Sequence, residues 1–86
     1  MRVLIADDDM TTLFVLKNMV DRTGHEVVCA TDGREAWEMI EQGPPPAVAV
    51  VDWMMPEMDG VELCRRVRAS DTCAGLYFIL VTTREG

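Results

Sequence analysis

The chain has 86 residues, of which 49% are hydrophobic and 27% are charged, a composition typical of one small globular domain and too apolar for a disordered chain. Fifteen acidic residues against eight Lys and Arg give a formal net charge of -7, which argues against direct nucleic-acid binding because neutralising phosphates requires a basic face. No apolar run reaches membrane-spanning length and no signal peptide is recognisable, so we expect a cytoplasmic protein without membrane contact.

The first part of the chain predicts a strand, a helix and a second strand. RVLIA at residues 2–6 is a short continuous apolar run, which is typical of a strand covered on both faces. A helical pattern follows, for which Thr11 or Thr12 can serve as the N-cap, and Gly24 is placed to end it. HEVVCA at residues 25–30 is the next strand candidate.

The second part repeats this alternation twice. Asp32 opens a second helical pattern, which Gly43 ends before a run of prolines. AVAVV at residues 47–51 and LYFILV at residues 76–81 are further buried-strand candidates, and Asp59 can cap a third helix between them. Together these segments predict the order β-α-β-α-β-α-β.

Such an alternation predicts an α/β fold, a doubly wound parallel sheet with right-handed crossovers. We expect one domain over residues 1–86 that is incomplete at its C-terminus, because a further helix is expected after residues 76–81. The fourth strand would then be an apolar sheet edge, which a second copy of the chain can cover by pairing. A homodimer through this strand is therefore one expectation.

Acidic residues follow two of the predicted strands. Asp7, Asp8 and Asp9 end the first strand and Asp52 ends the third. Ligands of open parallel sheets bind at the carboxyl ends of the strands, so these acids converge if the two strands are neighbours. A divalent cation relieves their repulsion, and carboxylates with a backbone carbonyl and waters suit Mg²⁺. We expect Asp9 to face water instead.

Three motifs in order, IADDD, VVDWMMPEMDG and ILVTT, resemble those of the receiver domain of two-component response regulators. The resemblance spans the chain from the first strand to the fourth. It implies a flavodoxin-like sheet with strand order 2-1-3-4, in which the fifth strand and the last helices of the family are missing. It also implies a phosphorylation-dependent signalling switch and not a metabolic enzyme.

The resemblance carries roles onto individual residues. Asp52 matches the phospho-acceptor, which takes a phosphoryl group from a sensor histidine kinase or a phosphotransfer protein. Asp7, Asp8 and Asp52, with the backbone carbonyl of Met54, match the Mg²⁺ site. Thr82 matches the switch hydroxyl that relays the change.

Three matched positions and one missing residue modify this expectation. Thr83 matches a position that the family keeps small, and Met54 and Arg84 match positions that tune the lifetime of the phosphate. Arg84 can lie over the phosphate or be solvated. The family's lysine has no match, because Lys17 lies on the first predicted helix. The alternative to a phosphorylation switch is a non-phosphorylated interaction module on the same scaffold.

Overall fold

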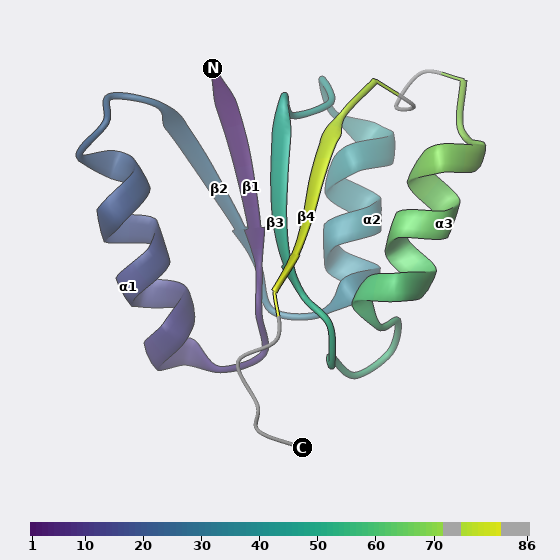
Figure 1. The fold of residues 1–86 in the computed structure, drawn as a ribbon, viewed down its shortest axis with the longest axis horizontal. Coiled ribbons are helices and arrows are strands. Elements are labelled where there is room, and N and C mark those ends of the chain that lie inside the picture. The colour runs from purple at the N-terminus through teal and green to yellow at the C-terminus, as the bar shows by residue number, and fades with distance from the viewer. Residues whose placement is uncertain (72–74, 82–86) are drawn as a thin grey trace.

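The computed structural model describes residues 1–71 and 75–81. Helices and strands alternate along these residues as the sequence predicts (Figure 1), in the order β1 (Arg2–Ala6), α1 (Met10–Asp21), β2 (Glu26–Ala30), α2 (Gly33–Gln42), β3 (Val48–Asp52), α3 (Gly60–Ala69) and β4 (Tyr77–Val81). Within the described ranges, no helix is long and apolar enough to cross a membrane.

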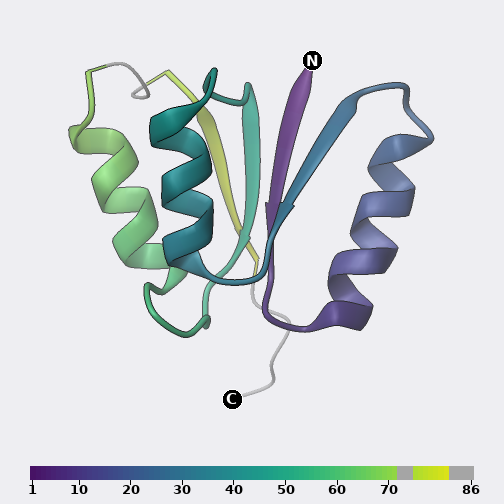
Figure 2. The same cartoon turned by 180° about the vertical axis from the view of Figure 1, so that it is seen from behind.

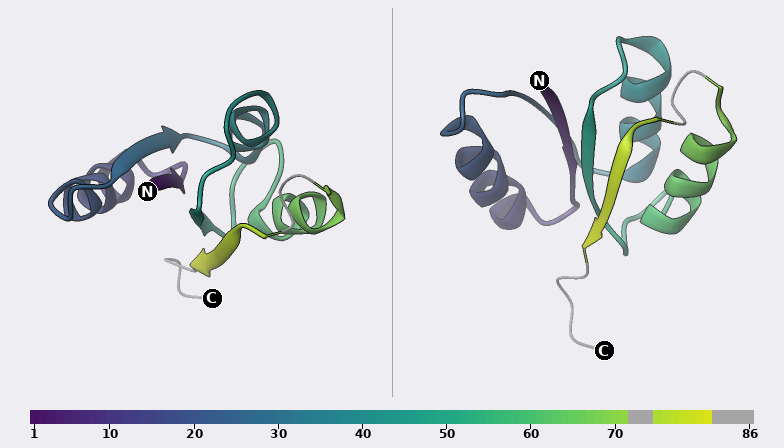
Figure 3. Two further views of the ribbon diagram at one scale, coloured as in Figure 1. Left: turned by 90° about the horizontal axis from the view of Figure 1, so that it is seen from above. Right: turned by 45° about the horizontal axis from the view of Figure 1, so that its top comes forward.

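The four strands form one parallel sheet in the order β2-β1-β3-β4, which confirms the predicted fold class and strand order. Helix α1 lies on one face of the sheet, and α2 and α3 lie side by side on the other (Figures 1 and 2). The view from above makes the three layers plain (Figure 3). All four strands run the same way, so their carboxyl ends share one edge, at the bottom of Figure 1.

Each face of the sheet has its own hydrophobic core. Val3 and Ile5 of β1 pack with Leu13 of α1, whereas Leu4 of β1 packs in the larger core with Leu63 of α3. Successive side chains of a strand point to opposite faces, so a strand covered on both faces has no polar position. This explains why β1 reads as a continuous apolar run.

The N-caps of α2 and α3 are Asp32 and Asp59, as predicted. The expectation of Thr11 or Thr12 at the start of α1 is wrong, because the N-cap is Asp9. Its carboxylate accepts hydrogen bonds from the Thr11 backbone N–H at 3.1 Å and from the Thr12 hydroxyl at 2.8 Å. The helix therefore begins directly after the acidic triplet.

Two glycines let α2 and α3 approach the loop that follows β3. A Cβ atom at Gly33 would collide with the backbone carbonyl of Met58, and one at Gly60 would lie 2.6 Å from the carbonyl oxygen of Asp52. Distances below about 3 Å leave no room for a side chain. These close approaches fix both helices against the loop beside Asp52.

The fourth strand lies at the edge of the sheet, as expected. Within the described residues β4 pairs with β3 alone. Its Tyr77 is 67% exposed, and Ile79 and Leu80 are also exposed. The strand carries no charged side chain, so it lacks the charges that usually protect sheet edges.

Candidate metal and phosphoryl-acceptor site

Three of the predicted site residues come together at the carboxyl edge of the sheet. Strands β1 and β3 are neighbours, and Ala6 pairs with Val51, so Asp7 and Asp52 leave the sheet side by side. One carboxylate oxygen from each of Asp7, Asp8 and Asp52 lies within 4.8 Å of the other two. The convergence inferred from the strand order is therefore present in the structure.

Burying the carboxylates of Asp7 and Asp52 lowers the stability of the folded state. Asp7 is 2% exposed and Asp52 is 3% exposed. Both carboxylate oxygens of Asp52 are buried, and no described residue gives them a hydrogen bond. A buried charge without a partner is strongly unfavourable, so a bound cation would stabilise this carboxylate.

The pKa of Asp7 is raised above its ordinary value, chiefly because the carboxyl group is buried and then because the charges of Asp52, Asp8 and Asp9 are close. The Asp9 backbone N–H opposes this shift, since it donates a hydrogen bond to Asp7 Oδ1 at 2.8 Å. Desolvation and like charges both disfavour the ionised form of a carboxyl group. The site therefore has an excess of negative charge that a cation would relieve.

Backbone hydrogen bonds hold the two strand ends in place. The Asp7 N–H donates to Ala30 O at 3.1 Å, and the Trp53 N–H donates to Val81 O at 2.9 Å. The Gly60 N–H donates to Trp53 O at 2.8 Å, which closes the loop after β3 onto the start of α3. The side chain of Trp53 is itself half exposed beside this rigid frame.

The donor set fits a hard divalent cation. All three side chains offer oxygen atoms, and they come from two adjacent strand ends, so a small ion can reach them together. Mg²⁺ prefers carboxylate, carbonyl and water oxygens. Asp7, Asp8 and Asp52 are thus the residues that could hold Mg²⁺, and the strongest sign that the ion fits is that the Asp52 oxygens accept no hydrogen bond from any described residue.

The remaining predicted site residues are not tested by the structure. Thr82, Thr83 and Arg84 lie outside the described residues. Met54 lies in the loop after β3 with an exposed side chain. Lys17 forms an ion pair with Asp21 of the same helix, with 2.8 Å between Lys17 Nζ and Asp21 Oδ2.

Asp9 is the residue whose part the sequence reading missed. It is exposed to water as expected, but its side chain also caps α1 and its backbone N–H donates a hydrogen bond to Asp7, which was not predicted. The signal was available, because an Asp followed by a helical pattern is a typical N-cap. It was considered only as one of the acids that follow the first strand.

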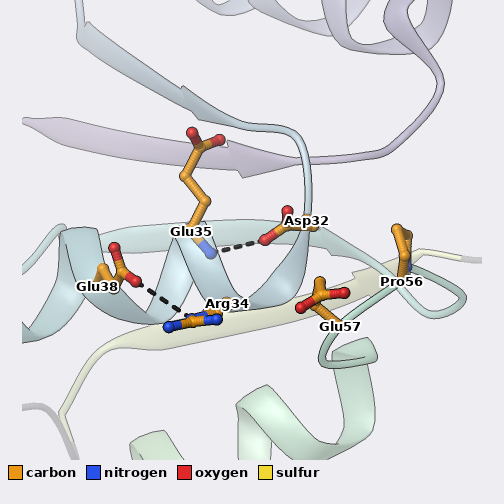
Figure 4. A pocket seen from close by; sticks show the side chains of 6 residues that line it. All are labelled: Asp32, Arg34, Glu35, Glu38, Pro56 and Glu57. Carbon is orange, nitrogen blue, oxygen red and sulfur yellow. Dashed lines mark hydrogen bonds and ion pairs between the residues drawn. The ribbon is translucent and has the colours of Figure 1, made fainter.

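A second acidic hollow lies beside the start of α2, shown in Figure 4, with a volume of about 460 Å³. It contains none of the predicted site residues, and its lining is Asp32, Arg34, Glu35, Glu38, Pro56 and Glu57. The Glu35 N–H donates to Asp32 Oδ1 at 2.7 Å, and Arg34 pairs with Glu38 at 3.4 Å (Figure 4). Much of its charge is therefore engaged within α2.

Comparisons with known proteins identify the class. The response regulator receiver domain model matches residues 3–86. The chemotaxis protein CheY homolog of Campylobacter jejuni is 39% identical over 87 residues, which cover 100% of this chain and 67% of that relative. The receiver domain of the Francisella response regulator 1452 matches with a TM-score of 0.87 at 30% identity, covering 99% of this chain and 68% of that one. The chain belongs to the response regulator receiver domain family.

A more distant structure has the same fold. The receiver domain of the sensor histidine kinase PA1611 from Pseudomonas aeruginosa matches with a TM-score of 0.86 at 23% identity, covering 92% of this chain and 64% of that one. That protein has a magnesium ion coordinated in its active-site cleft.

Receiver domains are regulatory phospho-acceptors of two-component systems, and they act with histidine kinases or phosphotransfer proteins.

Proposed function

We propose that this receiver domain is a Mg²⁺-dependent switch in which Asp52 is the phospho-acceptor. The observation that carries the proposal is the Asp52 carboxylate, which is buried, has no hydrogen-bond partner among the described residues and lies against Asp7 and Asp8. A carboxylate buried without a partner destabilises the fold, so packing alone does not account for one at this position. A ligand and a reaction do.

The reaction is a displacement at phosphorus. One Asp52 oxygen attacks the phosphoryl group of a phosphohistidine on a sensor kinase or phosphotransfer protein, and an acyl phosphate forms. The P–N bond breaks, and its electron pair stays on the imidazole nitrogen, which takes up a proton. A carboxylate nucleophile requires no general base, so positioning and charge stabilisation supply the catalysis.

Asp8 and Asp52, with the backbone carbonyl of Met54, would hold Mg²⁺ directly, and Asp7 would hold it through water. Mg²⁺, when bound, offsets the negative charge that builds on the transferring phosphoryl oxygens. Because the three carboxylates lie together at the strand ends, they would keep the ion beside the attacking oxygen of Asp52. The receiver domain of PA1611, which has the same fold and contains a magnesium ion, supports this assignment.

The relay is assigned by motif. Thr82 hydrogen-bonds to the new phosphate, and Thr83 leaves access to it. The side chain of Met54 cannot orient an attacking water, because it has no strong hydrogen-bonding group. We therefore expect slow self-dephosphorylation, and a phosphate lost within seconds would contradict this.

A mass measurement tests the proposal. The protein is incubated with Mg²⁺ and a small phosphodonor such as acetyl phosphate, and the intact mass is followed. We expect the gain of one phosphoryl group, its loss when EDTA replaces Mg²⁺, and no gain in Asp52→Asn. Asp21→Asn, a change of an exposed acid on α1, is the matched control and should be phosphorylated normally.

A wild-type protein that gains no mass, and shows no shift with beryllofluoride, would instead support the non-phosphorylated interaction module.

Self-association is a separate question. We propose that the exposed apolar edge of β4 pairs with β4 of a second copy. Light scattering that shows a monomer at all accessible concentrations would overturn this pairing.

A further inference from the structure

Four hydrogen bonds converge on Asp9, the last acid of the triplet. Its N–H donates to Asp7 Oδ1 at 2.8 Å, and its carbonyl accepts from the Leu13 N–H at 2.9 Å. Its carboxylate accepts from the Thr11 N–H at 3.1 Å and from the Thr12 hydroxyl at 2.8 Å. The residue therefore joins a carboxylate of the acidic cluster to the first turn of α1.

That first turn is anchored in the core. Leu13 is 5% exposed and packs with Val3 and Ile5 of β1. The strand that delivers Asp7 and the helix that Asp9 caps are thus joined twice, once by apolar packing and once through Asp9. Of these two joints, the one through Asp9 makes the direct hydrogen bond to the Asp7 side chain.

We propose that Asp9 is a positioning residue for magnesium binding. Its capped side chain holds the backbone of residue 9 with its N–H on Asp7 Oδ1, so one oxygen of Asp7 is fixed and the other is presented to the ion. Partners that orient metal ligands commonly change metal affinity by about 10–100-fold when they are lost. This inference rests on the proposed function, since it concerns the same site.

Charge offers a competing account, because Asp9 also adds a negative charge near the cluster. The two accounts make different predictions. Asn keeps a side-chain oxygen that can accept the capping bonds but removes the charge, whereas Ala removes both. A charge effect at this exposed position weakens as salt is added, and a positioning effect does not.

The experiment is a Mg²⁺ titration followed by the fluorescence of Trp53, with Trp37→Phe in every protein so that one tryptophan remains. The variants are Asp9→Ala, Asp9→Asn and Thr12→Val, compared at low and high salt. Asp32→Ala is the matched control, because it removes the N-cap of α2 and not that of α1. Melting temperatures without Mg²⁺ show how much each cap contributes to folding.

We expect Asp9→Ala to weaken Mg²⁺ binding about tenfold at both salt concentrations. Asp9→Asn should stay within about twofold of the parent at high salt, and Thr12→Val should fall between them. Asp32→Ala should lower the melting temperature and leave Mg²⁺ affinity unchanged. Thr12→Val keeps the test valid if Asp9→Ala does not fold, because it removes one hydroxyl alone.

Three results would overturn the inference. Asp9→Ala or Thr12→Val could bind Mg²⁺ like the parent, which would make the cap purely structural. Asp9→Asn and Asp9→Ala could be weakened equally and recover together at high salt, which would assign the effect to charge. Asp32→Ala could weaken Mg²⁺ binding as much as Asp9→Ala, which would assign it to general loosening. A parent protein that binds no Mg²⁺ would instead refute the proposed function itself.

Discussion

The acids at the strand ends and the acids on the helices differ in their burial and in their ion-pair partners. Asp7 and Asp52 are almost fully buried, and the oxygens of Asp52 have no partner among the described residues. On the helices, Asp21 pairs with Lys17 at 2.8 Å, and Glu62 pairs with Arg65 at 2.8 Å. Within the described residues, Lys and Arg side chains thus pair with these helix acids, and none pairs with Asp7 or Asp52.

This distribution is the reverse of what stability alone would favour. Exposed ion pairs contribute little, because water and salt already screen the charges, whereas an unaccompanied buried charge is costly. The difference fits the proposed cation site, because a bound cation would supply the positive charge that the described residues do not bring to the cluster. The two groups of acids should therefore respond in opposite ways to metal, substitution and pH.

Magnesium gives the largest expected effect. A ligand at 100 times its dissociation constant stabilises the folded state by about 2.7 kcal/mol, which corresponds to roughly 10–20 °C in the melting temperature of a domain this size. We expect this rise on adding Mg²⁺ and its reversal with EDTA, measured by thermal unfolding. Asp52→Asn should lose most of the rise.

Glu62→Gln is the control for that measurement, because it changes a paired acid on α3. It should keep the full response to Mg²⁺. An equal loss in both variants would mean that the ion binds diffusely to a chain of net charge -7, and the contrast between the two groups of acids would fail.

The frame that holds Asp52 gives the next effect. Gly60→Ala places a methyl group 2.6 Å from Asp52 O and 2.7 Å from a Leu80 methyl, so the backbone must shift. Overpacking of this kind costs about 1–3 kcal/mol, and we expect weaker Mg²⁺ binding as well. Gly75→Ala is the control, because a Cβ there meets nothing within 4 Å. Chemical denaturation of both variants, with and without Mg²⁺, measures the two effects; equal stabilities would show that the close approach is unimportant.

The sequence predicted the features that depend on short-range signals. The strands were found because both faces are covered, and Asp32 and Asp59 were found because an N-cap acts on its own first turn. The convergence of Asp7 and Asp52 followed from the strand order. The motif assigned the role of phospho-acceptor to Asp52, but only the structure shows that its two carboxylate oxygens have no hydrogen-bond partner among the described residues.

The features that were missed depend on contacts between distant segments or on one residue with two roles. No local pattern shows that Gly33 lies against Met58, because α2 and the loop after β3 meet only in the folded chain. Asp9 faces water as expected, but its second role as the N-cap of α1 was not predicted, because it was considered only as one of the acids that follow the first strand. Residues 82–84 lie outside the described residues, so their roles still rest on the motif.

Replacing a buried acid should trade function for stability. Asp7→Asn removes a desolvated charge beside Asp52 and keeps an oxygen to accept the Asp9 N–H. We expect a gain of about 1 kcal/mol in the unfolding free energy without Mg²⁺, as is common when a strained functional site is relieved. The response to Mg²⁺ should fall at the same time. A variant that is less stable than wild type without Mg²⁺ would contradict this.

The pH dependence of that gain follows from the sign of the pKa shift. The folded-state pKa of Asp7 is raised, so at neutral pH its charge destabilises the folded state. This cost is relieved as the pH falls through the raised pKa toward the unfolded-state value. The stability difference between Asp7→Asn and wild type should therefore shrink from pH 7 toward pH 4 in chemical denaturation without Mg²⁺. A difference that is constant over this range would assign the gain to packing.

The smallest effect should come from the helix pair, with the opposite sign in pH. Hydrogen bonds from Arg65 and Arg66 lower the pKa of Glu62, so its contribution is present above the unfolded-state pKa and is lost as the pH falls through the lowered value. Because the pair is exposed, Glu62→Gln should leave the melting temperature close to wild type at neutral pH. Any difference should shrink in acid and in high salt, as thermal unfolding across pH and salt would show. A loss larger than the gain from Asp7→Asn would mean that the exposed pairs, and not the buried cluster, dominate the electrostatics of this fold.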